Sequence, residues 1–524
     1  MAADQADPVV STPHGALRGR YERGVAVFRG IPYAQPPFGP RRFRPPEPLP
    51  PWDGVRDAGA FGPTPPKPPY SEAFAPYLSD PVIPGDDILN LNVWTPAPDP
   101  AARLPVLVWL HGGALTRGSS AVPVYDGHAF ARDGVVCVSL NYRLGVEGYG
   151  LFPDAPANPG LRDQIAALAW VHETIEAFGG DPGRITLFGQ SAGAISIGAL
   201  LAAPQTRGMV RRAVLQSGPP EAAERTRVRR MVRRMASRLR IPATAEAFAA
   251  VDRDLLLRTQ AEVGRLSSPV IGGPAFGIVV DGDVVPRDPL EALLDGAAPG
   301  VDLMTGWTRD EHRLWLVPGG LMERLDRLGA VALAGAMARC RCGSEVPRGY
   351  RVLRPEAGTA DLVGDLVTDH LLRIPLHRLA DARTEPSYVY EFAWPSRLPG
   401  LGACHALELG FVFDTGEVPE SRRLAGEGAP QDLADALHWA WVRFAADGDP
   451  GWQRWDATHP VRVFGDPAPD AQDPLAHTAH GPRDRELALW TRDALTPSPV
   501  GTPPGTELRT AVRRFRRAGG LRRR

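Results

Sequence analysis

The amino-acid sequence predicts an α/β fold in which a large, mostly parallel central sheet carries helices on both faces. From about residue 104, short runs rich in Val, Ile and Leu alternate with longer segments of helical pattern. Such runs are typical of strands that are buried on both sides of a parallel sheet. With 524 residues, the chain is long enough to bury a sizeable core.

The expected strands and helices follow one another along the chain. Apolar runs predict strands over 105–110, 135–140, 185–188, 213–215 and 301–304. Between the second and third of these strands, apolar residues recur at helical spacing over 161–178. A glycine stop followed by a proline, Gly179-Gly180-Asp181-Pro182, ends that predicted helix.

Two further segments are expected to cover the body of the fold. Proline and glycine are dense over 32–84, so this segment should be mostly loop. Residues 223–240 should form an arginine-loaded amphipathic helix with its apolar side chains on one face. We interpret the arginine face as solvated, with a partner site as the alternative.

Composition excludes several classes of protein. The 59 basic and 60 acidic side chains leave a formal charge of −1, which argues against nucleic-acid or membrane-surface binding by the fold as a whole. No apolar run reaches the roughly 18 residues of a membrane-spanning helix, and the first residues lack the pattern of a signal peptide, so we expect a cytoplasmic protein. The four cysteines are too few and too unevenly spaced for a disulfide framework or a four-cysteine zinc site.

The pentapeptide Gly189-Gln190-Ser191-Ala192-Gly193 is the first candidate for chemistry, because it stands between a predicted strand and a predicted helix. A serine on such a sharp turn is held in strained backbone geometry, and glycines two positions to either side remove steric clashes. The helix N-terminus then lies beneath the negative charge that develops during acyl transfer. This placement predicts Ser191 as a nucleophile.

A second glycine-rich turn offers hydrogen-bond donors for that charge. His111-Gly112-Gly113-Ala114 directly follows the strand 105–110, at the carboxyl edge of the same sheet. The backbone N–H groups of Gly113 and Ala114, together with that of Ala192, would form a three-donor oxyanion hole.

The general base should be a histidine held by a carboxylate, and with this kind of serine turn the chain order is serine, acid, histidine. Glu311 is the candidate acid because it follows the strand 301–304. His405 is the candidate base because it lies in a loop, where catalytic side chains are usually mounted. His370, His377 and His438 fall in helical patterns, which favour satisfied or surface histidines.

The chain resembles the type B carboxylesterases, an α/β-hydrolase family that includes para-nitrobenzyl-type esterases and cholinesterases. The resemblance runs from Val9 to about Trp490 and is carried by Phe28-Arg29-Gly30-Ile31-Pro32-Tyr33-Ala34, Leu89-Asn90-Leu91-Asn92-Val93-Trp94, Asn141-Tyr142-Arg143-Leu144-Gly145, Asn158-Pro159-Gly160-Leu161-Arg162-Asp163-Gln164, Phe178-Gly179-Gly180-Asp181-Pro182 and Gly402-Ala403-Cys404-His405-Ala406-Leu407-Glu408. It implies an α/β-hydrolase fold, a Ser191, Glu311 and His405 triad, the oxyanion hole above, and no metal or organic cofactor.

The resemblance also implies one large domain, which we place at 1–494, before a Pro/Gly linker and arginine-rich disordered tail over 495–524. Where the family carries a buried arginine–glutamate pair, this chain has Arg42 and Asp86, and we expect those two to form a hydrogen bond.

The sequence departs from the family pattern at several positions. Asp86-Asp87-Ile88 replaces the common Glu-Asp-Cys, and 50–80 holds no cysteine, so the family disulfide should be absent. Gln190 stands where glutamate is frequent, Leu115 where an aromatic residue is frequent and Gly410 where proline is frequent. None of these positions belongs to the triad, but each changes the expected shape of the pocket.

These observations predict a serine carboxylester hydrolase that acts through an acyl-enzyme on small-molecule esters, with its oligomeric state left open. Neutral Gln190, and the absence of tryptophan between Gly54 and Gly85, favour neutral short-to-medium acyl or aryl esters over choline esters. Tyr70, Phe74 and Tyr77 leave a weaker aromatic option for a cation. The alternatives are a catalytically dead domain used for binding, and an acyltransferase or lactone-forming cyclase that carries the same residues.

A truncation after Asp493 should leave esterase activity and solubility unchanged, because the Pro/Gly linker cannot pack and the terminal arginines are expected to stay solvated. Comparing soluble yield and ester turnover of the full and truncated chains checks this. Loss of either property on truncation would show that the tail contributes to the folded protein.

Overall fold

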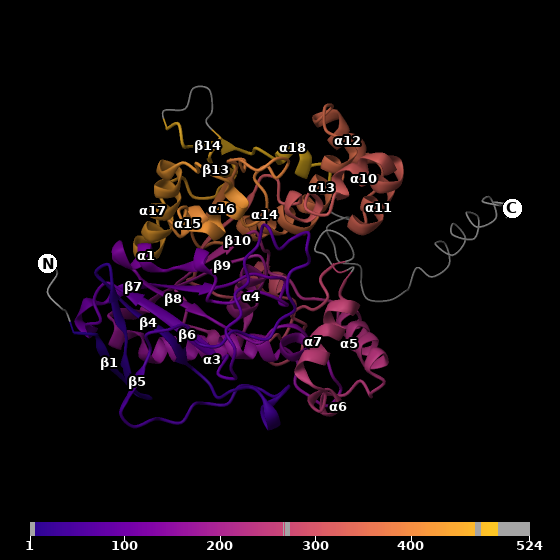
Figure 1. The fold of residues 1–524 in the computed structure, drawn as a ribbon. Coiled ribbons are helices and arrows are strands. Elements are labelled where there is room, and N and C mark those ends of the chain that lie inside the picture. The colour runs from indigo at the N-terminus through magenta and orange to yellow at the C-terminus, as the bar shows by residue number, and fades with distance from the viewer. Residues whose placement is uncertain (1–5, 266, 268–272, 467–472, 491–524) are drawn as a thin grey trace.

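The computed structural model describes residues 6–265, 267, 273–466 and 473–490, which contain a large mixed sheet and a small one (Figure 1). Within these residues the large sheet has eleven strands. In sheet order they are β14 (Ala476–His480), β13 (Pro460–Phe464), β12 (Ser387–Phe392), β11 (Asp302–Thr308), β10 (Arg212–Gln216), β9 (Gly180–Gln190), β7 (Leu104–Leu110), β8 (Val136–Leu140), β6 (Asn90–Thr95), β4 (Val25–Pro32) and β3 (Arg20–Glu22). The small sheet contains β1 (Val9–Thr12), β2 (Gly15–Arg18) and β5 (Val55–Asp57).

The centre of the large sheet is parallel, as predicted. All neighbouring pairs from β8 to β13 are parallel, whereas the outer pairs at both edges are antiparallel. Strands β8 and β9 flank β7 on opposite sides, so the strand order reverses at β7. In open α/β sheets, ligands bind at the carboxyl ends of the strands beside such a switch point.

Helices cover both faces of the sheet. Successive side chains of its central strands point to opposite faces, and they are buried in two separate cores. Val106, Val108 and Leu110 of β7 pack in one core with α3 (Pro159–Thr174) and α4 (Ala192–Ala202). Leu107 and Trp109 pack in the other with α1 (His128–Arg132) and α17 (Gln431–Asp447). Figure 1 shows α3 and α17 on opposite sides of the sheet. The predicted fold class is confirmed.

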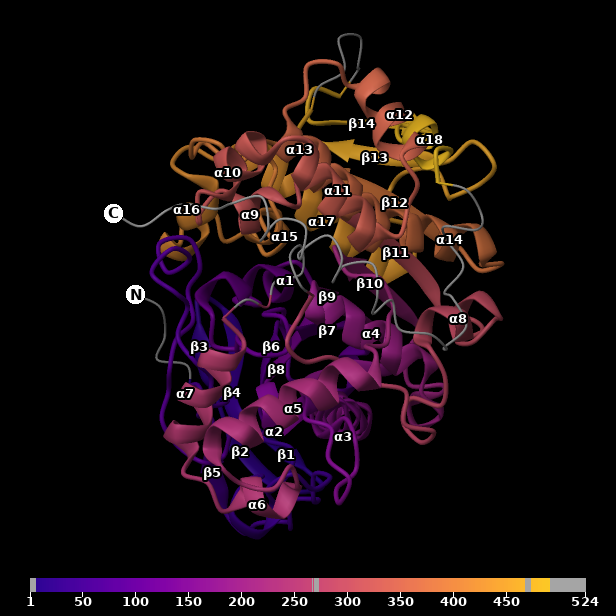
Figure 2. The ribbon, with the colours of Figure 1, turned by 90° about the vertical axis from the view of Figure 1, so that its right-hand side faces the viewer.

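The remaining helices form two groups at the periphery (Figure 2). One contains α5 (Arg225–Leu239), α6 (Ala245–Ala249) and α7 (Arg253–Val263). The other contains α9 (Arg313–Leu316), α10 (Leu321–Leu328), α11 (Ala330–Cys340), α12 (Glu345–Leu353) and α13 (Thr359–Thr368). The rest are α2 (Gly145–Tyr149), α8 (Pro289–Leu294), α14 (Ile374–Ala382), α15 (Leu409–Val412), α16 (Pro419–Ala425) and α18 (Asp484–Leu487).

Most element predictions are confirmed, with small shifts at their ends. Helix α3 ends at Thr174 and continues as a 3₁₀ turn, Ile175–Phe178, before Gly179, whose φ of 86° makes the expected stop. Strand β9 begins at Gly180, earlier than the apolar run indicates, because it pairs with β7 there. The segment between β4 and β6 is mostly loop, as expected. The predicted linker and tail over 495–524 lie outside the described residues.

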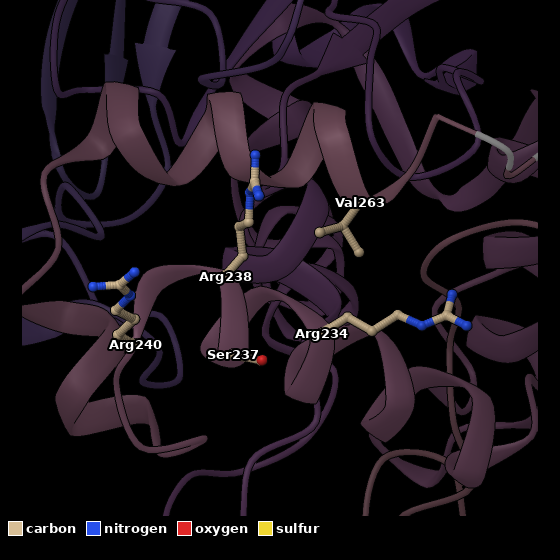
Figure 3. A pocket seen from close by; sticks show the side chains of 5 residues that line it. All are labelled: Arg234, Ser237, Arg238, Arg240 and Val263. Carbon is tan, nitrogen blue, oxygen red and sulfur yellow. The ribbon is translucent and has the colours of Figure 1, made fainter.

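The arginine-rich helix is confirmed as α5. Its apolar side chains Val228, Met231, Val232 and Met235 are buried, whereas six arginines at 229, 230, 233, 234, 238 and 240 are exposed. A surface hollow between α5 and α7 is lined by Arg234, Ser237, Arg238, Arg240 and Val263. Figure 3 shows its three guanidinium groups pointing in different directions, so they do not converge on one point, and Arg238 forms an ion pair with Glu262 at 2.9 Å.

The expected contact between Arg42 and Asp86 is wrong. Arg42 instead forms an ion pair with Glu147 of α2, and it donates to the carbonyl oxygens of Ala249 and Val251 at 2.9 and 2.7 Å. Asp86 pairs with Arg253 at the surface, where its side chain is 66% exposed. Asp86 therefore lies at the surface, and the buried partner of Arg42 is Glu147, which comes from a helix distant in sequence.

The Arg42→Ala substitution should destabilise the protein by about 3 to 5 kcal/mol, because it leaves the buried Glu147 carboxylate and two carbonyl oxygens without their partner. Arg253→Ala is the matched control, and since its partner is exposed it should cost about 1 kcal/mol or less. Denaturant unfolding of both variants measures the difference. Equal effects would mean that the Arg42 pair is no more important than a surface pair.

Candidate active site

The candidate residues meet at the carboxyl edge of the parallel strands. Ser191 directly follows β9, and the turn from His111 to Ala114 follows β7. Glu311 lies three residues beyond the end of β11, and His405 lies in the loop that follows β12. Because these four strands run parallel, segments far apart in sequence share one edge.

Ser191 caps the N-terminus of α4 with φ and ψ of 56° and −122°. A non-glycine residue in this region is strained, as expected for a serine on a sharp strand-to-helix turn. The turn is crowded: a Cβ atom on Gly193 would lie 1.9 Å from the carbonyl oxygen of Leu110, at the end of β7. The glycine therefore allows the helix start to contact the neighbouring strand, and Ser191 remains partly exposed.

The turn after β7 lies against the nucleophile. A Cβ atom on Gly112 would be 3.3 Å from Cβ of Ser191, which shows how closely the two turns approach. Within the described residues, the backbone N–H groups of Gly113, Ala114 and Ala192 donate no hydrogen bond to the protein. Gly113 and Ala114 are also partly exposed, with φ of 110° and 54°. These N–H groups remain available to a ligand.

Glu311 and His405 are in direct contact. Nδ1 of His405 lies 2.5 Å from Oε2 of Glu311, and the backbone N–H of Thr308 donates to the other carboxylate oxygen at 2.8 Å. Glu311 is fully buried, and Asp310 beside it exchanges backbone and side-chain hydrogen bonds with Ala403, which anchors the histidine loop. Burial acts to raise the pKa of Glu311, but His405 and these hydrogen bonds outweigh it and lower that pKa below its usual value.

A second contact of the imidazole is with Gln190, a residue that the sequence indicated only as a neutral replacement. Nε2 of the Gln190 side chain lies 2.9 Å from Nε2 of His405. Within the described residues, no hydrogen bond joins Ser191 Oγ to His405. The Trp315 ring packs on the imidazole with its centroid 4.4 Å away. No sequence signal could have identified Gln190 as the partner, because the contact depends on the side-chain rotamer.

Two buried groups near the site hold unusual protonation states. Burial lowers the pKa of His111 to about 3, so this histidine stays neutral. Its ring stacks on Tyr142, whose hydroxyl donates to the His111 carbonyl at 2.6 Å. Burial and the charge of Glu311 raise the pKa of Glu408 to about 8, so Glu408 is mostly protonated at neutral pH.

The other histidines considered in the sequence occupy structural positions. His438 is buried in α17 between the carbonyl of Val412 and Asp133, at 2.9 and 3.0 Å. His370 lies in a π-helical turn, and His377 is buried in α14. Within the described residues no group of three His, Cys, Asp or Glu side chains is arranged to hold a metal ion. All four cysteines are free.

A pocket lies between the turn after β7 and the loop that carries His405. Its wall includes Gly112 and Gly113 on one side and Ala406 and Leu407 on the other. Tyrosines and aliphatic side chains form most of the remaining wall, including Tyr70, Tyr77, Tyr125, Val122, Val124 and Leu424. Among the described residues that line the pocket, Glu420 is the one acidic side chain. The pocket can hold a mainly apolar group beside the available N–H donors.

Comparison with known proteins agrees with this geometry. A sequence model described as the carboxylesterase family matches residues 6–463. Para-nitrobenzyl esterase of Bacillus subtilis (strain 168) is 36% identical over 470 residues, which cover 86% of this chain and 92% of that protein. Phenmedipham hydrolase of Pseudarthrobacter oxydans is 36% identical over 500 residues, which cover 90% and 98%.

Solved structures give the same result. The crystal structure of a Geobacillus stearothermophilus carboxylesterase at pH 6.2 superposes with a TM-score of 0.80 at 36% identity, covering 92% of this chain and all of that one. A para-nitrobenzyl esterase structure superposes with a TM-score of 0.78 at 32% identity, covering 94% and 100%. Within the described residues, no helix is both long and apolar enough to cross a membrane.

Proposed function

Because the chain belongs to the carboxylesterase family and is a serine esterase by that membership, we propose that it hydrolyses esters with Ser191 as nucleophile, His405 as general base and Glu311 as the carboxylate that orients the base. The contact of Glu311 with His405, at the sheet edge where Ser191 begins α4, is the observation that carries this assignment. The proposed catalytic domain is residues 1–494.

In the proposed mechanism, the proton of Ser191 moves to Nε2 of His405 while Oγ bonds to the ester carbonyl carbon. The N–H groups of Gly113, Ala114 and Ala192 bind the oxyanion that forms. The imidazolium then protonates the leaving alcohol, and water repeats the cycle to release the acid. Glu311 accepts the Nδ1–H of His405 throughout, which fixes the tautomer and stabilises the imidazolium.

We further propose that the substrates are neutral short-to-medium acyl or aryl esters, handled in the cytoplasm. The pocket wall beside Gly113 is largely tyrosine and aliphatic, which favours an apolar or aromatic group. Gln190 adds no charge next to the nucleophile. The relative named para-nitrobenzyl esterase supports an aromatic alcohol by its printed name. Free cysteines are consistent with a reducing compartment.

The Ser191→Ala substitution should lower ester turnover by about six orders of magnitude, the scale for losing a triad nucleophile. The rate of p-nitrophenyl ester hydrolysis by purified wild type and variant measures this. Ser196→Ala, on the same helix but buried beside Gln164, is the control and should keep its turnover. Comparable rates for Ser191→Ala and wild type would refute the assigned nucleophile, and an inactive wild type that still binds esters would favour the binding-domain alternative.

A neutral ester should be turned over with a higher kcat/KM than the choline ester of equal acyl length, because the tyrosine wall offers a weaker cation site than tryptophan. A panel of matched acyl and alcohol variants measures the preference. The Glu420→Gln variant should reduce whatever choline-ester activity exists and leave neutral esters unaffected. A choline ester that exceeds its neutral isostere about tenfold, roughly 1.4 kcal/mol, would overturn the preference.

A further inference from the structure

The side-chain amide of Gln190 contacts Nε2 of His405, the nitrogen through which His405 would act as a base. Its amide nitrogen lies 2.9 Å from Nε2 of the imidazole, and Gln190 and His405 are only 3% and 5% exposed. Gly112 packs closely against the oxygen of the same amide: a Cβ atom added to Gly112 would lie 3.0 Å from Oε1 of Gln190. The contact is therefore between two packed, buried groups.

The chemistry of the two groups makes this contact complementary. The carboxylate of Glu311 only accepts hydrogen bonds, so the proton of the neutral imidazole is on Nδ1. Nε2 then carries a lone pair, and an amide N–H of Gln190 can donate to it. Once Nε2 is protonated, it has no lone pair left to accept a hydrogen bond from the Gln190 N–H. The hydrogen bond from Gln190 thus stabilises the neutral imidazole and not the imidazolium.

We propose that Gln190 is a positioning residue that occupies the lone pair of His405 in the resting enzyme and yields it to Ser191 when an ester binds. An imidazole nitrogen has one lone pair, so the Gln190 N–H and the Ser191 O–H compete for it. During acylation the Ser191 proton moves to Nε2 as Oγ bonds to the carbonyl carbon. That proton leaves with the alcohol when the ester C–O bond breaks. This inference rests on the proposed triad and adds a step before it.

Other groups around the imidazole must be separated from this effect. Glu311 faces it from the segment after β11, Glu408 lies on its own loop, and Trp315 packs on it from α9. Among the described residues, Cys404 and Tyr390 interact electrostatically with Glu311 and Glu408, and Asp310 holds the histidine loop through Ala403. Glu408 titrates near pH 8, so its effect falls on the alkaline side of the pH profile. A change at Gln190 should appear on the acidic side.

The experiment compares the pH dependence of kcat/KM for wild type, Gln190→Met and Gln190→Glu with one neutral ester. Methionine removes the donor at similar length, so the acidic limb should move to higher pH by about half a unit to one unit. Glutamate places a carboxylate that accepts from the imidazolium, so the limb should move by about one to two units in the same direction. The order wild type, methionine, glutamate is the signature of a donor at Nε2.

Gln164→Met is the matched control, since Gln164 is an equally buried glutamine whose Nε2 contacts Tyr149 and Ser196 at 3.3 Å, away from His405. It should change stability without moving the limb. A fluorophosphonate that reacts with the active serine, mapped by mass spectrometry, measures the fraction of competent enzyme in every sample.

The two proposals fail in different ways. If the wild type is not labelled at Ser191, the proposed function fails, and with it the role of Gln190. If Ser191 is labelled in wild type and in either Gln190 variant, but the acidic limb coincides with that of wild type, the role of Gln190 is refuted while the triad stands. One folded Gln190 variant is sufficient for this decision.

Discussion

The close approach of three backbone segments around Ser191 is the constraint on which the rest of the site depends. The end of β7, the end of β9 and the first turn of α4 meet so tightly that side chains larger than hydrogen have no room at Gly193 or Gly112. This packing holds Ser191 in its strained conformation and brings the turn from Gly112 to Ala114 close to it. The strain is maintained because the strands on either side are buried in two cores and cannot relax.

Glu311 and His405, the proposed carboxylate and base, are positioned near Ser191 by a second set of contacts. Asp310 exchanges hydrogen bonds with the backbone of Ala403. Glu311, the residue after Asp310, contacts the imidazole of His405, which lies two residues after Ala403. Glu311 and His405 are therefore held by the same pair of connected segments. These hydrogen bonds attach the loop after β12 to the segment after β11, and β11 and β12 are neighbours in the parallel sheet.

The sequence was sufficient to predict the fold class and the approximate places of the central strands, because both depend on local apolar patterns. The triad of Ser191, Glu311 and His405 was assigned from local motifs and chain order, and its catalytic role stays a prediction. The sequence was not sufficient for contacts that depend on side-chain reach across the fold. Arg42 meets Glu147 and not Asp86, since a helix distant in sequence supplies the longer carboxylate. The contact of Gln190 with His405 was missed for a similar reason, because the pentapeptide specifies a turn and not the direction of the side chain before the serine.

The charge balance around His405 joins these observations. Two glutamates lie near the imidazole, but burial and mutual repulsion keep Glu408 largely protonated while Glu311 is ionised. Gln190 places a neutral amide beside His405, where a glutamate at the same position would add a third carboxyl group. In the proposed mechanism, the imidazolium of His405 would therefore meet one ionised carboxylate, that of Glu311, and the pair would be neutral overall. A second ionised carboxylate beside the imidazolium would stabilise it further and weaken it as the acid that must protonate the leaving alcohol.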